Sequence, residues 1–387
     1  MKKLAAVIAI VIVIMAVFAG CLSVSSSTIG FSPDDLAAPK ITYAEVANVT
    51  MPMPITASLN DVDLALSWSI TEDIYAGSGG ALWLNVENIN RMGQMYIYGL
   101  GLVWDDGTST RRDCSVYVSA GEKKTLGLLI FDAPTDLGPH SYNIVVKVAA
   151  TEREFSFPEG SSQVWRDYGE KRTQSANSAE VISLLDVTVQ DVSINTRGYY
   201  SRINSLVSYE AAEEVAEAAR AKWPEDYNIL QVVEAFEWIR SSVEYKEDAG
   251  FDHWQSAKET MELRTGDCED HAILMASTIG ALGGNARVNI VQGHAFPTVF
   301  VGTMEQQMEQ VEAAIASYYG LPEGQLTASY LVDDLGYWLV VDTTGFPYAG
   351  GIPAQSGRSA DGGWSMNSSY LYAIDATGDA SVGLFNF

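Results

Sequence analysis

The stretch Thr265-Gly266-Asp267-Cys268-Glu269-Asp270-His271-Ala272 places a cysteine where a helix is expected to begin. Asp267 is a favourable N-cap residue, and the apolar run that follows predicts a helix to about Leu282. Because the free amide groups and the dipole of a helix N-terminus favour a thiolate, Cys268 is a candidate nucleophile. The acids beside it are expected to cap backbone groups of the first turn. The alternative is a buried structural thiol.

Two later residues supply the other parts of a thiol-based catalytic site. His294 stands in Gly293-His294-Ala295-Phe296 at the head of an expected strand, and Asp342 ends the strand-like run Tyr337-Trp338-Leu339-Val340-Val341. A nucleophile, a base and a group that orients the base are what such a site needs. The plainer alternatives are a core histidine and an aspartate that caps a turn.

His271 is the competing base. It follows Cys268 by three positions and therefore neighbours it on the surface of the expected helix. That helix offers no separate element to carry an orienting group, so His294 is the preferred base. His271 is expected to lie behind the site or at the surface.

The order Cys, His, Asp and the local sequence around each residue resemble the transglutaminase-like superfamily, whose fold is related to the papain-like cysteine proteases. The resemblance covers residues 229 to 348. It implies an α+β catalytic domain with Cys268, His294 and Asp342 as the triad, and Trp254 as an oxyanion donor or a wall of the site. The chain departs from the family in reading His-Ala-Phe-Pro-Thr-Val and Asp-Thr-Thr, and in the long segment from 303 to 329.

This resemblance implies an enzyme that acts on peptide or carboxamide bonds, as a peptidase, an amidase or a transglutaminase-like acyl transferase. Hydrolysis is favoured over cross-linking, because water needs no second binding site. The expected partner is a protein or peptide substrate in the cell envelope. The alternative is a non-catalytic, membrane-anchored binding or assembly module that keeps a vestigial triad.

The N-terminal segment has the form of a lipoprotein signal. Met1-Lys2-Lys3 precedes sixteen uncharged, apolar residues and then Gly20-Cys21. We expect residues 1–20 to be removed and Cys21 to carry the lipid, which would hold an exported protein on the outer face of the cytoplasmic membrane. An uncleaved membrane anchor is the alternative, since sixteen apolar residues make a short span.

Between that signal and the catalytic domain, the spacing of apolar residues changes along the chain. Residues 21–55 are expected to be a tether, and the period-two pattern of 56–150 predicts an antiparallel, immunoglobulin-like β-sandwich. Residues 151–205 are expected to connect the domains through a strand or hairpin, and 206–387 to form the transglutaminase-like domain. The sandwich tryptophans are expected in the core and not on a ligand platform; they are Trp68, Trp83 and Trp104.

Composition limits the partners further. The formal net charge is -26, which disfavours nucleic acid and anionic lipid as specific partners. The chain has no HExxH motif and no paired Cys or His spacing, so neither a metal nor a cofactor is expected. Its three cysteines do not provide a disulfide framework, and Asn48 and Asn367 match only the short glycosylation pattern.

Overall fold

The computed structural model of the chain describes residues 30–381 apart from 46, 48–54, 60, 72–73, 91–92, 157–159, 174–176, 184–198, 249, 251, 323, 346, 359–363 and 367. Three predicted modification sites lie outside the described residues; they are Cys21, Asn48 and Asn367. Within the described part, no helix has the length and apolar character needed to cross a membrane.

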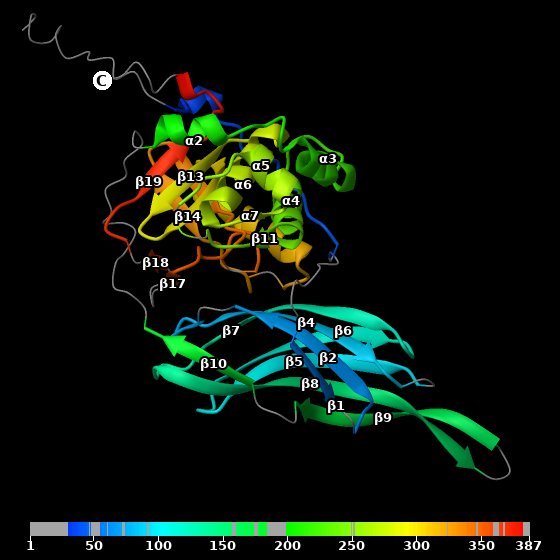
Figure 1. Cartoon of the computed structure of the whole chain (residues 1–387). Helices are drawn as coiled ribbons and strands as arrows, with labels where there is room; N and C mark the ends of the chain where they lie inside the picture. Colours follow the sequence, from blue (N-terminus) through cyan, green and yellow to red (C-terminus); the bar gives the residue numbers. More distant parts are fainter. Residues whose placement is uncertain are drawn as a thin grey trace, which may run out of the picture.

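The described residues from Ile55 to Ile182, called here the β domain, form strands and no helix (Figure 1). Its strands are β1 (Ile55–Leu59), β2 (Leu64–Ile70), β3 (Ile74–Tyr75), β4 (Gly80–Asn88), β5 (Met95–Trp104), β6 (Ser109–Val118), β7 (Lys123–Phe131), β8 (Gly138–Ser156), β9 (Gly160–Arg172) and β10 (Asn177–Ile182). They form one sheet of order β1-β2-β4-β7 and a second of order β3-β10-β8-β5-β6, with β9 paired to β8. The two sheets share a hydrophobic core.

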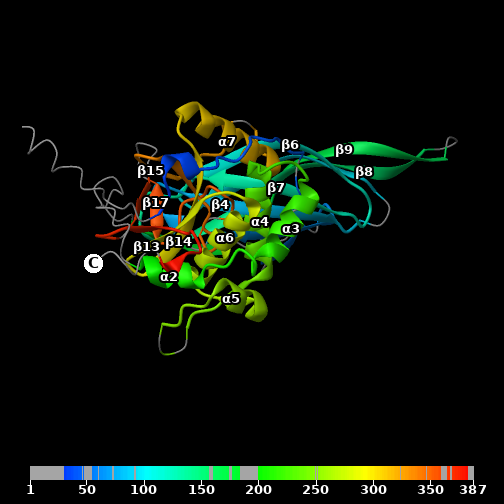
Figure 2. The ribbon, with the colours of Figure 1, turned by 90° about the horizontal axis from the view of Figure 1, so that it is seen from above.

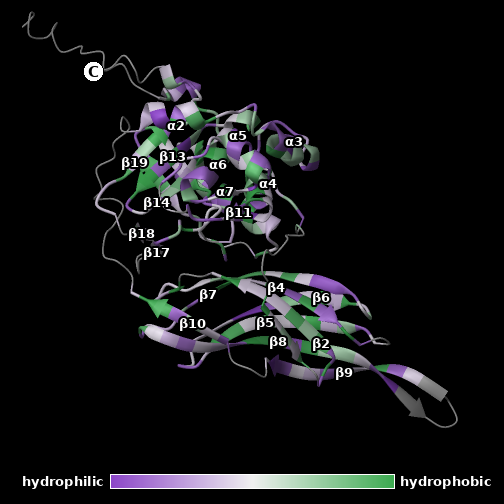
Figure 3. Cartoon of the chain, viewed as in Figure 1, coloured by the Kyte–Doolittle hydropathy of each residue, from purple (hydrophilic) through white to green (hydrophobic). Residues whose placement is uncertain are grey.

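Alternation along these strands decides which side chains enter that core. Leu64, Leu66 and Trp68 of β2 are buried with Ile144 and Val146 of β8, as the period-two pattern requires. The colouring of the strands accordingly changes between hydrophobic and hydrophilic along their length (Figure 3). Beyond residue 150, β8 continues to Ser156 and pairs with β9, so that the two extend past the rest of the molecule as a hairpin (Figures 1 and 2).

The second region, called here the α+β domain, mixes helices and strands. Its elements are α2 (Tyr200–Leu206), α3 (Glu213–Lys222), α4 (Ile229–Ser242), β11 (Glu244–Tyr245), α5 (Ala257–Leu263), β12 (Thr265–Gly266), α6 (Cys268–Leu282), β13 (Ala286–Val291), β14 (His294–Gly302), α7 (Glu305–Tyr318), β15 (Tyr330–Asp333), β16 (Gly336–Val340), β17 (Ser356–Arg358), β18 (Trp364–Met366) and β19 (Tyr372–Asp375). The main sheet has the order β15-β16-β14-β13-β19 with every neighbouring pair antiparallel. Mixed helix and strand content with antiparallel sheets agrees with the predicted α+β class.

Helix α6 is the centre of this domain. Twelve of its fifteen residues are buried, because the sheet strands β13 and β14 lie on one side and α3, α4 and α5 pack around the others. A helix that is apolar on all sides is stable only in such an interior position. The helix ends at Gly283, whose φ of 95° is the left-handed conformation that glycine adopts at low cost.

The segment 30–47, which was expected to be part of a tether, lies along the α+β domain instead. The N–H of Ile229 donates to the carbonyl of Lys40 at 2.9 Å, and the N–H of Ala47 donates to that of Tyr318 at 2.9 Å. The short helix η1 (Pro33–Asp35) consequently lies beside α2 and the end of the described chain (Figure 1). Apolar side chains of the segment also pack against the domain, among them Phe31, Leu36 and Ile41, but their spacing follows no regular period.

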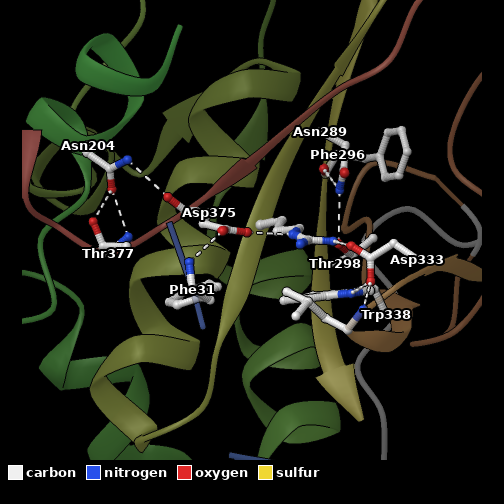
Figure 4. Close-up of polar contacts among 11 residues, drawn as sticks. Phe31, Asn204, Asn289, Phe296, Thr298, Asp333, Trp338, Asp375 and Thr377 are labelled. Atoms are coloured by element: carbon white, nitrogen blue, oxygen red, sulfur yellow. Dashed lines mark hydrogen bonds and ion pairs between the residues drawn. The ribbon is translucent and has the colours of Figure 1, made fainter. Parts of the chain in front are cut away.

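One buried cation ties this segment to the sheet. Arg287 on β13 donates from Nε to Asp375 Oδ1 and from Nη1 to Asp333 Oδ2, both at 2.6 Å. Asp375 also accepts the N–H of Phe31 at 2.7 Å, and the guanidinium lies 3.6 Å from the centre of the Trp338 ring. Figure 4 shows Asp375 between Phe31 and the β13 side chain, with Asp333 and Trp338 beyond it. The network therefore joins β13, β15, β19 and the 30–47 segment.

The β domain contacts the α+β domain through the outer face of its four-stranded sheet and through β6, the edge strand of the other sheet. The ring of Trp83 on β4 meets that of Tyr319 edge-on, with centroids 5.6 Å apart. Arg112 on β6 donates from Nη1 to the carbonyl of Gly320 at 3.0 Å. Trp83 is therefore buried as expected, but between the domains and not between the sheets, where Trp68 and Trp104 lie.

We predict that Arg287→Met will be strongly destabilising. The substitution leaves the buried carboxylate of Asp375 without its counterion, and breaking a buried ion pair in this way typically costs about 3–5 kcal/mol. Urea denaturation of Arg287→Met should show this loss, whereas Lys40→Met, which removes an exposed pair with Glu225, should change stability little. Equal stability of the two variants would contradict the role given to this network.

Candidate active site

Cys268 is the first residue of α6, and two carboxylates set the start of that helix. Asp267 is the N-cap, and it forms a capping box with Asp270, whose Oδ2 accepts the N–H of Asp267 at 3.2 Å. The structure therefore confirms that the helix begins at Cys268 and that Asp267 is its N-cap. The position of Cys268 follows from this cap, since the cap decides where the first helical turn begins.

Asp270 also holds the preceding loop. Its Oδ1 accepts the N–H of Gln255 at 2.7 Å, so one fully buried carboxylate joins the loop before α5 to the start of α6. A Cβ added at Gly266 would meet the Cβ of Asp270 at 2.6 Å, which explains the glycine at this position. Burial raises the pKa of Asp270 to about 7 against the lowering effect of the Gln255 N–H.

His294 and Asp342 form a buried pair at the sheet on which α6 packs. His294 opens β14, Asp342 follows the end of β16, and the distance from Nε2 to Oδ2 is 2.8 Å. Asp342 also accepts the N–H of Ala354 at 2.9 Å and the N–H and hydroxyl of Thr344 at 3.0 and 2.8 Å. Burial alone would raise the pKa of Asp342, but His294 and these donors together lower it. The carboxylate is thus ionised and oriented, and Nδ1 is the ring nitrogen that Asp342 does not bind.

The thiol of Cys268 lies against the same strand. The backbone N–H of Ala295, the residue after His294, faces the sulfur and acts to lower the pKa of Cys268. Helix α6 packs along β14 over its length, so Cys268 and His294 stand at the same end of two packed elements. The structure therefore brings Cys268 next to the strand that starts with His294, and it pairs His294 with Asp342.

One acid near the thiol does not take the expected position. Asp267 and Asp270 cap the backbone, but Glu269 faces the sulfur, and the thiol donates to its Oε2 at 3.2 Å. Burial and the Glu269 carboxylate raise the pKa of Cys268, although the Ala295 N–H acts in the opposite direction. Burial and hydrogen bonding with Asp252 raise the pKa of Glu269 itself to about 8. The sequence could not have located this contact, because it depends on which way a first-turn side chain turns.

Ligand atoms of three adjacent residues lie within 4.8 Å of one another; they belong to Asp267, Cys268 and Glu269. These atoms could approach a cation. The raised pKa values of Asp267 and Glu269 and the hydrogen bond between their side chains instead fit acids that share protons. Cys114 and Cys268 are both free thiols.

His271 is buried and makes no contact that would activate the thiol. Its Nδ1 lies 2.9 Å from the hydroxyl of Thr343, the residue after Asp342. Burial lowers the pKa of His271 to about 4, so the ring is neutral at pH 7. Of the two positions expected for it, behind the site or at the surface, the structure shows the first, because α6 is packed on all sides at that position. Through Thr343, His271 contacts the turn that follows Asp342.

Trp254 lies at the edge of the site but its donor is already used. The indole N–H donates to the carboxylate of Asp252 at 3.0 Å, and the guanidinium of Arg202 lies 3.5 Å from the ring centre. The indole N–H is therefore occupied in this structure and is not free to serve as an oxyanion donor. A cleft of about 1030 Å³ lies elsewhere, between the two domains beside Arg112 and Tyr319, and none of the three predicted catalytic residues lines it.

Comparison with known proteins agrees with the sequence resemblance over part of the chain. Residues 213–342, about a third of the chain, match the model of the transglutaminase-like superfamily, and the matched segment contains Cys268, His294 and Asp342. No curated protein matches. One similar solved structure is described as "Putative Cysteine Protease from Cytophaga hutchinsonii"; it is 12% identical over 62% of this chain and 73% of that chain, with a TM-score of 0.21. A TM-score this low supports no inference about fold or activity.

We predict that Glu269→Gln will lower the thiol pKa. A neutral amide removes the carboxylate charge that opposes the thiolate, so alkylation of Cys268 by iodoacetamide at pH 9 should become about ten-fold faster. The full pH profile of alkylation should shift to lower pH in this variant. Glu262→Gln on α5, which changes an exposed acid paired with Lys258, is the control and should leave the profile unchanged. An unchanged profile for Glu269→Gln would show that Glu269 does not face the thiol in solution.

Proposed function

We propose that this chain is a thiol enzyme that cleaves peptide or carboxamide bonds, with Cys268 as nucleophile, His294 as base and Asp342 as the orienting group. The observation that carries the proposal is the buried hydrogen bond of 2.8 Å between His294 and Asp342, at the strand end where the Cys268 thiol meets the N–H of Ala295. The match of this segment to the transglutaminase-like superfamily supports the same chemistry.

In the proposed reaction, the thiol proton passes to Nδ1 of His294 as the sulfur attacks the carbonyl carbon. The imidazolium, stabilised by Asp342, then protonates the leaving amine as the C–N bond breaks, which leaves a thioester on Cys268. Water attacks the thioester, His294 takes one of its protons, and the acid product leaves as the thiol forms again. The backbone N–H of Cys268 at the helix start is the proposed donor to the oxyanion.

The electrostatics favour proton transfer during attack over a preformed ion pair. Burial and Glu269 both raise the pKa of Cys268, so the resting group is a thiol and not a thiolate. His294 must therefore act as a general base in the step that forms the carbon–sulfur bond. This distinguishes the site from thiol enzymes whose cysteine is charged at rest.

Hydrolysis is the proposed outcome in preference to cross-linking, since water requires no second binding site for an amine. The proposed substrates are proteins or peptides of the cell envelope. The alternative is a membrane-anchored binding or assembly module with a vestigial triad. The observation that favours this alternative is Glu269, because a carboxylate beside a sulfur opposes nucleophilic attack.

Variants of the triad separate the two functions. A peptide-based, thiol-reactive probe should label the wild-type chain, and Cys268→Ala should abolish both labelling and turnover. Asp342→Asn should lower turnover by on the order of a thousand-fold, because it favours the wrong tautomer of His294. His271→Ala, which changes a neighbouring buried histidine, should lose less than about ten-fold if the protein stays folded by circular dichroism.

Two results would contradict the proposed enzymatic function. A wild-type chain that resists the probe while small alkylating reagents still reach Cys268 would favour the binding module. Equal turnover in wild type and Cys268→Ala would exclude a role for the thiol.

We also propose that the chain is exported and held by a lipid on Cys21 at the outer face of the cytoplasmic membrane. The support is the sequence alone: two lysines, sixteen apolar residues and Gly20-Cys21. Cys21→Ser should release or mislocalise the protein in a fractionation experiment, and mass spectrometry of the wild type should find a modified Cys21 at the N-terminus. Recovery of a mature chain that still begins with Met1 would contradict this.

A further inference from the structure

Four aromatic residues gather on the outer face of the six-stranded sheet of the β domain. Tyr96 and Tyr98 come from β5, Tyr117 from β6 and Trp165 from β9, and we call them the aromatic platform. Ring centroids lie 4.6 Å apart for Tyr96 and Tyr117, 6.0 Å for Tyr96 and Tyr98, and 6.1 Å for Tyr117 and Trp165. None of these residues was singled out by the sequence pattern.

Strand register explains how rings from three strands meet. Tyr96 is directly opposite Tyr117, and ordinary strand alternation puts Tyr98 on the same face as Tyr96 while Ile97 is buried in the core. Opposite Tyr96 on its other side is Ala149 of β8, whose small side chain leaves room above the sheet. Trp165 can reach Tyr117 across that space.

Two of the four rings are exposed, and those of Tyr96 and Tyr98 are half-buried. Tyr117 is 52% exposed and Trp165 is 46% exposed, whereas Trp68 and Trp104 are buried between the sheets. Large aromatic residues grouped at a surface indicate a binding role, because leaving their faces in water forgoes the stabilisation that burial gives. The four rings themselves do not line the cleft between the two domains, although β6 contributes Arg112 and Ser115 to it.

Polar groups surround the ring faces. The hydroxyl of Tyr98 donates to Asp167 Oδ1 at 2.7 Å, and that of Tyr96 donates to the Ser115 hydroxyl at 3.3 Å. Hydroxyl and carboxylate oxygens therefore lie at the ring edges. A ligand that stacks on the rings would find hydrogen-bond partners beside them.

Charges next to the platform are balanced. Arg111 and Arg172 both pair with Glu170, at 3.0 and 3.1 Å, and Lys147 lies 3.7 Å from Asp113. Asp167 adds a third acid to these three cations, so the surface beside the rings has no excess of either sign on a chain of net charge -26. An anionic ligand would be repelled by the chain as a whole. Asp167 is the one acid of this group that pairs with no described cation, and its Oδ1 already accepts the Tyr98 hydroxyl and the N–H of Gly169.

We propose that the aromatic platform binds an uncharged glycan. The apolar faces of successive pyranose rings would stack on Tyr117, Tyr96 and Trp165, and sugar hydroxyls would bond to oxygens such as those of Asp167 and Ser115. A sugar chain matches this surface because it presents apolar ring faces and hydroxyls together and carries no charge. The inference does not depend on the catalytic triad, since the platform lies on a separate domain.

Binding of soluble oligosaccharides tests the proposal. The full chain is titrated by calorimetry with cellohexaose, mannohexaose and chitohexaose, in a detergent without a sugar headgroup because residues 4–19 are apolar. At least one of the three should bind, and Trp165→Ala and Tyr117→Ala should each weaken that binding by about ten-fold. Trp165→Phe and Tyr117→Phe keep a ring and should retain most of it.

Tyr43→Ala is the matched control, since Tyr43 is 57% exposed and lies outside the platform; its binding should equal that of the wild type. Absence of binding to all three sugars at millimolar concentration would overturn the proposal. Equal sugar affinity in the wild type and in a variant that combines Trp165→Ala with Tyr117→Ala would also overturn it. A dimer seen by sedimentation velocity that only the platform variants dissociate, without sugar binding, would assign this face to a second copy of the chain.

Discussion

The candidate active site depends on one buried carboxylate. Asp270 accepts two backbone N–H groups, from Gln255 and Asp267, and so fixes both the loop before α5 and the first turn of α6. Because a carboxylate has two acceptor oxygens and this one is fully buried, each bond would be costly to lose. Cys268 lies between Asp267 and Asp270 in the chain, so its backbone is held with the helix start. Gly266 leaves the space that Asp270 occupies.

The remaining parts of the site follow from where α6 lies. The helix is enclosed by β13, β14 and three other helices, so its N-terminus can point only to the strand ends at which His294 and Asp342 are found. Asp342 is held by the backbone of the turn that follows it, through Thr344 and Ala354. Geometry is therefore imposed by backbone contacts, and burial together with Glu269 raises the pKa of the thiol.

Local patterns were sufficient for some of these features and not for others. The N-cap at Asp267, the extent of α6 and the strands that carry His294 and Asp342 were predictable, since caps and alternating apolar residues are short-range signals. The Arg287 network was not, because its partners lie 46 and 88 positions away. The docking of residues 30–47 was also missed, because backbone hydrogen bonds leave no trace in side-chain pattern. The aromatic platform depends on the register of three strands, which no single strand reveals.

The contact between Phe31 and Asp375 also bears on the order in which the two domains can fold during synthesis. It closes a loop of 344 positions, so the α+β domain cannot complete its sheet until β19 has left the ribosome. The β domain occupies one continuous stretch, from β1 to β10, and can bury its own core while the rest of the chain is still being made. A chain that stopped before residue 372 would keep that domain but would leave Arg287 without Asp375 and the N-terminal segment without its last anchor. Long sequence separation of this kind makes closure of the α+β domain the slow, final step.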